Sequence, residues 1–189
     1  MQLLLAHFLG DFVLQSNSLL KKKYHSWVGT AEHATIIALL TAAFLFPYWL
    51  AWSTWAIVFC ILGLHFTQDV LKVEYDKRFN VKLSTAPYFL DQVGHISLIA
   101  LLTWAFPLTQ NISLPKALHA LYFSPAFLFL ALSFIFLSFV YDITLYQFHH
   151  KKHPSKEYSP DVRGMAERMV SFLAFVLIFL FLHRIYLFT

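Results

Sequence analysis

A His-Phe-x-x-Asp motif occurs twice in this chain, and both copies lie within apolar sequence. The copies are HFLGD at residues 7–11 and HFTQD at residues 65–69. Each is followed by a second matching segment, HATIIALLTAAF from His33 and HISLIALLTWAF from His95. The paired segments predict that a helical hairpin has been duplicated in tandem, with the two hairpins at about residues 1–50 and 54–106.

The composition and the long apolar runs predict an integral membrane protein. The chain is 59% hydrophobic and 13% charged, whereas soluble domains average about a quarter charged residues. A spanning helix needs about 20 mostly apolar residues. Five windows supply such a run, and a shorter one at the N-terminus would span only with bilayer thinning or tilt of its neighbours: Thr30–Leu50, Thr54–Lys72, Pro87–Phe106, Pro125–Phe148, Met165–Phe188 and the short Met1–Gln15. We therefore expect an all-α, polytopic membrane helical bundle of about six helices. It would be a single domain over residues 1–189, with a C-terminal hairpin at about residues 125–188.

The basic residues predict how these helices are oriented. Twelve of the 14 Lys and Arg residues fall in the connections after the first, third and fifth expected spans. Cytoplasmic loops are enriched in Lys and Arg, so these connections are expected in the cytoplasm and both termini on the opposite side of the membrane. Tandem hairpins with one orientation are parallel repeats, related by a pseudo-twofold axis along the membrane normal. Lys21–Lys23 are expected to contact anionic lipid headgroups.

Seven ionisable residues of the two repeats fall at one predicted depth, toward the cytoplasmic leaflet. His7–Asp11, His65–Asp69 and Asp91–His95 are each spaced i, i+4, so the two members of each pair share a helix face. An Asp at the centre of a spanning helix costs about 2.5–3.5 kcal/mol. The seven must therefore be satisfied by one another, by water or by a cation. They are His7, Asp11, His33, His65, Asp69, Asp91 and His95.

Imidazole and carboxylate groups on neighbouring helices are typical of divalent metal sites in helical bundles. Mixed nitrogen and oxygen ligands favour Zn²⁺, with Mn²⁺ or Fe²⁺ as alternatives. Four His and three Asp exceed the usual needs of one ion, so one or two ions are expected, with carboxylates bridging. Two other interpretations stay open. The polar residues of membrane helices also form interhelical hydrogen bonds without chemistry, and they also build proton relays.

Four further side chains are predicted to serve the site around the metal ligands. Gln15 and Gln92 would orient substrate or ligands, and Lys72 and Arg168 would neutralise a phosphate. For Arg168 the alternative is a salt bridge with Asp142 at the entry of the last helix.

The ordered motifs resemble one protein family. They are His7-x-x-x-Asp11-x-x-x-Gln15, His33, His65-x-x-x-Asp69-x-x-Lys72 and Asp91-Gln92-x-x-His95. Over about the first hundred residues this set is similar to a bacterial family known as domain of unknown function 3307. The segment Gly164-x-x-Glu167-Arg168 is similar to one in its longer members. The resemblance implies a multi-pass inner-membrane protein and carries over no activity.

The residues themselves favour a membrane-embedded, divalent-metal-dependent hydrolase that works near the cytoplasmic leaflet. The basic side chains indicate a lipid or polyprenyl phosphoester as its substrate, with membrane lipids as its surroundings. Because the net charge of +4 lies in loops between spans, no nucleic-acid partner is expected. The main alternative is a non-enzymatic metal or proton transporter, or a metal-binding membrane sensor. A di-iron oxidoreductase and a structural subunit without a site are the remaining alternatives.

Overall fold

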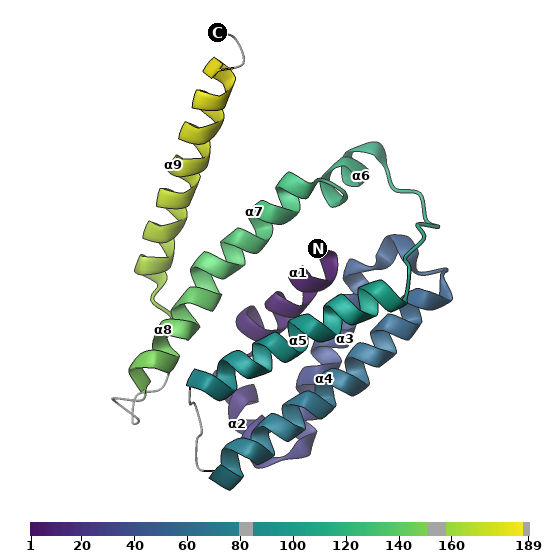
Figure 1. The fold of residues 1–189 in the computed structure, drawn as a ribbon, viewed down its shortest axis with the longest axis vertical. Helices are drawn as coiled ribbons and strands as arrows, with labels where there is room; N and C mark the ends of the chain where they lie inside the picture. The colour runs from purple at the N-terminus through teal and green to yellow at the C-terminus, as the bar shows by residue number, and fades with distance from the viewer. Residues whose placement is uncertain (80–84, 151–157, 187–189) are drawn as a thin grey trace.

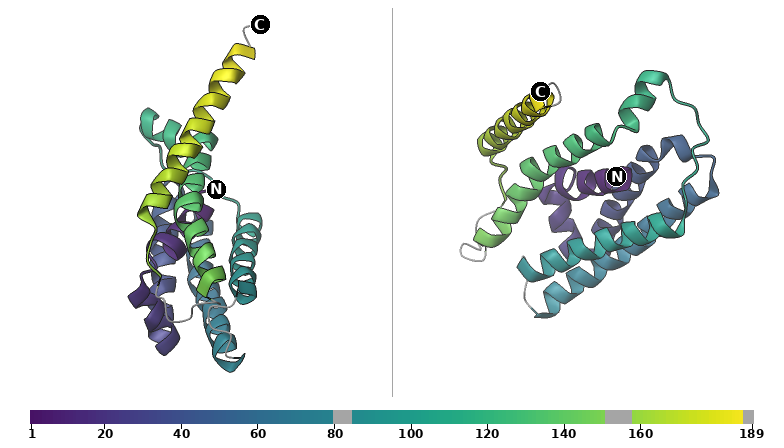
Figure 2. Two further views of the ribbon diagram at one scale, coloured as in Figure 1. Left: turned by 90° about the vertical axis from the view of Figure 1, so that its left-hand side faces the viewer. Right: turned by 45° about the horizontal axis from the view of Figure 1, so that its top comes forward.

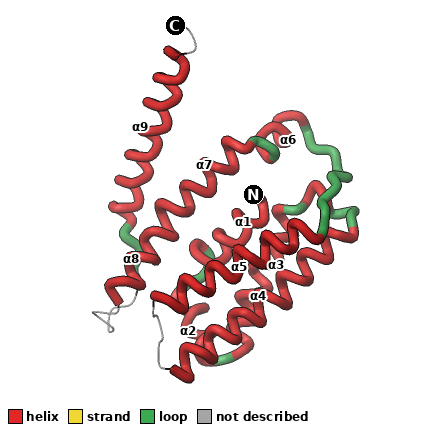
Figure 3. Tube along the Cα trace, in the orientation of Figure 1, coloured by secondary structure: helices red, strands yellow, loops and turns green. Residues whose placement is uncertain are grey.

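A computed structural model describes residues 1–79, 85–150 and 158–186, and over these residues the chain is helical with no strand (Figure 3). The expected all-α class is therefore confirmed. The helices that form the bundle are, in chain order, α1 (Gln2–Phe8), α2 (Asn17–His25), α3 (Trp27–Phe44), α4 (Trp52–Phe79), α5 (Thr85–Ala105), α6 (Lys116–Tyr122), α7 (Pro125–Ile135), α8 (Tyr141–His150) and α9 (Val162–Tyr186).

Serine residues begin three of these helices. The hydroxyl of Ser16 accepts a hydrogen bond from the backbone N–H of Leu19, and Ser26 and Ser124 accept equivalent bonds at the starts of α3 and α7. A serine in extended conformation supplies a partner for an N–H group that the first helical turn leaves unsatisfied. Pro125 follows the last of these caps, in a position where its fixed φ suits the first helical turn.

The lengths and the apolar composition of the helices indicate a membrane protein. Three stretches in the described part of the chain are long and apolar enough to cross a membrane: Trp27–Phe44, Trp52–Phe79 and Pro125–Phe148. The bent pair Gln2–Val13 and Asn17–His25 makes a fourth if it counts as one broken span. The window expected at 87–106 corresponds to α5, and the one expected at 165–188 falls on α9 and the residues after it.

The chain bends sharply after its first short helix. A π-helical turn, Leu9–Val13, continues α1, and α2 then sets off at 89° to it. The sequence of Ser16, Asn17 and Ser18 explains the break, because these short polar side chains compete for backbone groups and favour caps over helix interiors. The short first span of the prediction is thus part of a broken helix.

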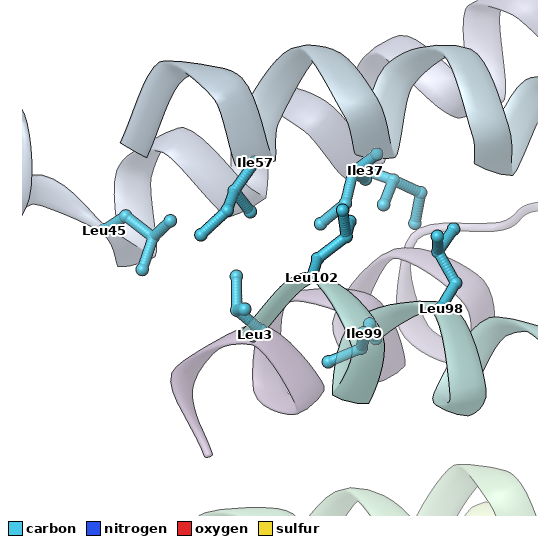
Figure 4. Packing of buried hydrophobic residues seen from close by; sticks show 8 residues of the cluster. Leu3, Ile37, Leu45, Ile57, Leu98, Ile99 and Leu102 are labelled. Atoms are coloured by element: carbon cyan, nitrogen blue, oxygen red, sulfur yellow. The ribbon is translucent and has the colours of Figure 1, made fainter. Parts of the chain in front are cut away.

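The short α1 lies at the centre of the bundle, where it packs against α3, α5 and α7 (Figures 1 and 2). A cluster of buried aliphatic side chains fills the space on one side of the polar site, between α1, α3, α4 and α5. Figure 4 shows these side chains pointing toward one another: Leu3, Ile37, Leu45, Ile57, Leu98, Ile99 and Leu102, with Ile61 beside them. A second apolar cluster, which includes Phe12 and Ile135, joins α1 and its π-helical turn to α7.

The last helix stands apart from the rest of the bundle. α9 packs against a π-helical turn, Phe136–Val140, that lies between α7 and α8, and it then extends away from the other helices (Figure 1). Its exposed side chains include Val170, Phe175 and Leu177. Such an apolar surface suits contact with lipid rather than with water.

Candidate metal centre

The structure brings all seven predicted ligand residues together at the middle of the bundle. α1 and its π-helical turn supply His7 and Asp11, and α3 supplies His33. The second repeat supplies the other four from α4 and α5. The four histidines are at most 2% exposed. Six of the seven side chains are buried and Asp91 is nearly so. Burial of titratable groups in one place is costly unless they share partners, so these residues must satisfy one another or bind a cation.

Separations within the cluster match those of a metal coordination shell. Between histidine nitrogens and carboxylate oxygens they run from 3.1 Å for His33 and Asp11 to 3.8 Å for His95 and Asp69. His65 lies 3.5 Å from Asp69 and 3.7 Å from Asp11. Two ligands bound tetrahedrally at about 2.0–2.2 Å lie roughly 3.3 Å apart. An ion can therefore bind with small movements of these side chains.

Three overlapping groups of ligand atoms each lie within 4.8 Å of one another and can hold a metal ion. They are His7, Asp11 and His65, then His33, His65 and Asp69, and then Asp69, Asp91 and His95. His65 and Asp69 each belong to two groups, and of these two side chains only the Asp69 carboxylate has acceptor atoms for two ions. The rings of His65 and His95 are stacked with centroids 4.1 Å apart, which places the second-repeat ligands side by side.

Several imidazole nitrogens of the cluster are buried without a hydrogen-bond partner among the described residues. The Nε2 atoms of His7, His65 and His95 are in this group. A buried nitrogen without a partner costs about 1–3 kcal/mol. Each of these nitrogens faces a carboxylate at 3.3–3.6 Å. Lone pairs that converge in this way suit coordination of a cation, and the donor set therefore fits a divalent metal.

Lys23 lies inside the site, contrary to the expectation that it contacts lipid headgroups. Its Nζ is 2.8 Å from Oδ2 of Asp69, and its side chain is 8% exposed. The bend after Val13 is the physical reason, because it turns α2 back along α3 and directs Lys23 inward. Lys22, the neighbouring lysine, is exposed and pairs with Glu32.

A second buried network next to the site was not predicted. The Tyr24 hydroxyl donates to Oδ2 of Asp76 at 2.6 Å, and the Lys72 ammonium donates to the same oxygen at 3.0 Å. Asp76 is 1% exposed. It lies seven residues after Asp69, two helical turns further along the same face of α4. The seven-residue spacing could have revealed Asp76 from the sequence. It shows that the polar face of α4 that contains Asp69 continues toward the end of the helix.

Three of the four predicted auxiliary side chains line the cavity beside the metal ligands. Gln92 donates to Asp11 and to Asp91 at 3.5 and 3.4 Å, while Gln15 and Lys72 lie at the cavity wall. Arg168 does not line this cavity. Its guanidinium donates to the Leu137 carbonyl and lies 3.5 Å from Asp142. The salt-bridge alternative is therefore the arrangement that the structure contains.

The cavity has a volume of about 90 Å³ and is lined by polar and aromatic side chains from both repeats and from the C-terminal part. The predicted ligand residues Asp11, Asp69 and Asp91 form part of its wall. Tyr158 also lines the cavity and donates to Asp142 at 3.0 Å. Burial and this carboxylate raise the pKa of the Tyr158 hydroxyl above its usual range. The phenol therefore remains a hydrogen-bond donor at neutral pH.

Apolar packing closes the other side of the centre. His7, His65 and His95 border a cavity of about 10 Å³ whose other walls include Leu3 and Ile61. These two side chains belong to the aliphatic cluster of Figure 4. A space of this size holds about one water molecule at most. The site thus opens on the side of the 90 Å³ cavity.

These observations define a helical protein that encloses a buried His–Asp centre and has helices long and apolar enough to span a membrane. The family model described as a protein of unknown function (DUF3307) matches residues 1–124. The chain belongs to that family, as its motifs predict. The matched region contains all seven ligand residues and both repeats, while α7, α8 and α9 lie beyond it. No curated protein and no solved structure matches the chain.

Proposed function

We propose that this protein is a membrane-embedded, divalent-metal-dependent hydrolase acting on a lipid or polyprenyl phosphoester near the cytoplasmic leaflet. The observation that carries the proposal is the buried convergence of four histidines and three aspartates at 3.1–3.8 Å beside an open polar cavity. Zn²⁺ is the preferred ion because the ligands are imidazole and carboxylate without thiolate.

The charges of the site support a divalent cation. Asp11, Asp69 and Asp91 bring three negative charges, and Lys23 returns one positive charge. Histidines that act as ligands are neutral. The remaining charge of about −2 corresponds to one divalent ion, and a second ion would add the positive charge that a phosphate substrate neutralises. Burial of this cluster without a cation would leave uncompensated charge at high cost.

When bound, such an ion lowers the pKa of its water and polarises a phosphoryl oxygen. The chain's own groups then divide the remaining work. Lys72 lies at the cavity wall, where its ammonium can pair with a phosphate oxygen. Gln92 bonds to Asp11 and Asp91 and so fixes the orientation of two ligands. Lys23 holds Asp69 in place from the other hairpin.

A transporter would need a polar route to both sides of the membrane. The aliphatic cluster next to His7, His65 and His95 favours a hydrolase, since it closes that side of the centre with apolar packing. The position of the basic residues motivates the cytoplasmic orientation and the inner-membrane location.

The test combines metal analysis with turnover. Protein purified without chelator is expected to contain at least one divalent ion per chain and to release phosphate or the lipid alcohol from lipid phosphoesters. Asp69→Asn keeps the shape of the side chain and removes its charge, so the metal content and the turnover should both fall, the latter by about 100-fold or more. Glu74→Gln on the exposed face of α4 is the matched control and should change neither.

Metal uptake into proteoliposomes is measured in parallel with turnover, for the wild-type protein and for Asp69→Asn. Uptake that depends on Asp69, in protein without turnover of any lipid phosphate, would overturn the hydrolase in favour of transport. Metal-free protein with unchanged properties in Asp69→Asn would overturn the metal centre itself.

A further inference from the structure

A second hollow lies between α4 and α5, outside the centre described above. It has a volume of about 310 Å³ and is more open than the polar cavity. Its lining consists of Gln68, Leu71, Lys72, Tyr75, Pro87, Leu90, Asp91 and Gly94. The two helices diverge toward this end of their hairpin, as Figures 1 and 2 show. We call this hollow the α4–α5 groove.

The α4–α5 groove continues into the metal centre. Lys72 and Asp91 line both the groove and the polar cavity. One of them is a predicted metal ligand, and the other is a cation that forms part of the cavity wall. A molecule in the groove would therefore have its polar end at the site and its other end at the surface of the helices.

The outer part of the groove is apolar and faces outward. Leu71 and Leu90 are 65% and 72% exposed, and Tyr75 is half exposed. Gly94 leaves the groove free of a side chain at this point. A Cβ there would lie 3.3 Å from the Gln68 amide nitrogen and would narrow the groove. In a spanning protein such a surface is in contact with lipid chains.

The lining of the groove favours a lipid as its occupant. Leu71 and Leu90 form its exposed apolar part, and Lys72 lies where the groove meets the polar cavity. A slender hydrocarbon chain fits the space, and the Lys72 ammonium at its inner end complements an anionic headgroup.

We propose that the α4–α5 groove binds the hydrocarbon chain of an anionic lipid, which enters sideways from the bilayer with its phosphate directed to Lys72 and the metal centre. The phosphate at the reacting end rests on the proposed hydrolase function. The binding of the chain does not depend on turnover, and the experiment measures it separately.

The probe is a lipid monophosphate that carries a photoactivatable diazirine in its acyl chain, presented to the full-length protein in phosphatidylcholine nanodiscs. Labelled peptides are mapped by mass spectrometry. Labelling is expected on the segments 71–75 and 87–94. Leu90→Trp fills the groove, so labelling there should fall about tenfold. Leu101→Trp is the matched control, since Leu101 is also exposed on α5 and lies outside the groove, and labelling should not change.

A probe of the same chain with an uncharged headgroup should label the groove about tenfold less, as the loss of a charge-assisted contact predicts. Metal content verifies that Leu90→Trp is folded. If the wild-type protein is labelled in the groove but hydrolyses no lipid, this result would support lipid binding in the groove and contradict the proposed hydrolase. Labelling spread over the exposed apolar surface, or equal labelling of Leu90→Trp and Leu101→Trp, would overturn the groove even if hydrolysis is found.

Discussion

The two hairpins supply the same ligands from different frameworks. His65 and Asp69 follow His7 and Asp11 by 58 residues, and the ring centroids of His7 and His65 lie 5.6 Å apart. The second hairpin runs as one helix of 28 residues through its motif, whereas the first breaks after Val13 and bends by 89°. A tandem duplication would account for six of the seven ligand residues, and divergence of the two copies for Asp91 and for what surrounds the ligands.

The divergence gives the two hairpins opposite charges at the site. α2 exists because of the bend and places Lys23 against Asp69. In the second hairpin, Asp91 occupies the position that corresponds to Gly29, since both precede the shared histidine of their repeat by four residues. One copy therefore contributes a cation and the other an additional carboxylate. This asymmetry makes one side of the centre suited to a metal ion and the other suited to anchoring α2.

The largest expected effect comes from removal of the cation. Lys23→Met leaves the buried Asp69 without its ammonium partner, and loss of one member of a buried ion pair costs about 3–5 kcal/mol. Unfolding of metal-free protein in detergent, followed by helical circular dichroism, measures the change in free energy. Added Zn²⁺ should recover part of the loss, because the ion compensates the same carboxylate.

Lys22→Met is the control for this change. Lys22 pairs with Glu32, and the two side chains are 60% and 48% exposed, so the loss should stay below about 1 kcal/mol. Equal destabilisation by the two substitutions would mean that the first hairpin does not depend on a buried cation.

A smaller effect is expected where α2 lies against α3. A Cβ added at Gly29 would lie 2.6 Å from the backbone nitrogen of Lys23, so Gly29→Ala must push the helices apart. Overpacking of this kind costs about 1–3 kcal/mol, and the displaced Lys23 should weaken metal retention as well. Gly63→Ala in the second hairpin has open space around it, and there alanine should stabilise α4 by up to about 1 kcal/mol. Thermal unfolding of the two variants should show opposite changes in stability, a loss for Gly29→Ala and a gain for Gly63→Ala.

The ligand set was predictable from the sequence, while much of its surroundings was not. Helical periodicity places the i, i+4 pairs on one face, and duplication implies that the two faces meet, so the motifs alone were enough to group the seven residues. Lys23 was missed because three consecutive lysines indicate a surface loop. The serine at position 16 was the overlooked signal, since a capping residue there starts a new helix and puts Leu19 and Lys23 on its buried face.

The pairing of Arg168 could not be decided from the sequence, because the competing partners lie on elements distant along the chain. The same holds for the number of spans. α5 contains Asp91, Gln92 and His95 within otherwise apolar sequence, and sequence windows alone do not show which polar residues face inward.

The smallest expected effect concerns the bend that separates the two hairpins. The Ser16 hydroxyl accepts from Leu19 N–H at 3.2 Å and thereby begins α2. Ser16→Ala removes this cap and should cost about 1 kcal/mol, measured by thermal unfolding. Glu74 stands at the corresponding position of α4, 58 residues on, where it is exposed and pairs only with Lys77 among the described residues, so Glu74→Ala should cost about 0.5 kcal/mol or less. A loss confined to the first hairpin would show that a local cap maintains the bend. Equal effects would instead assign the bend to the packing of α2 on α3, with Lys23 and Gly29 as its principal determinants.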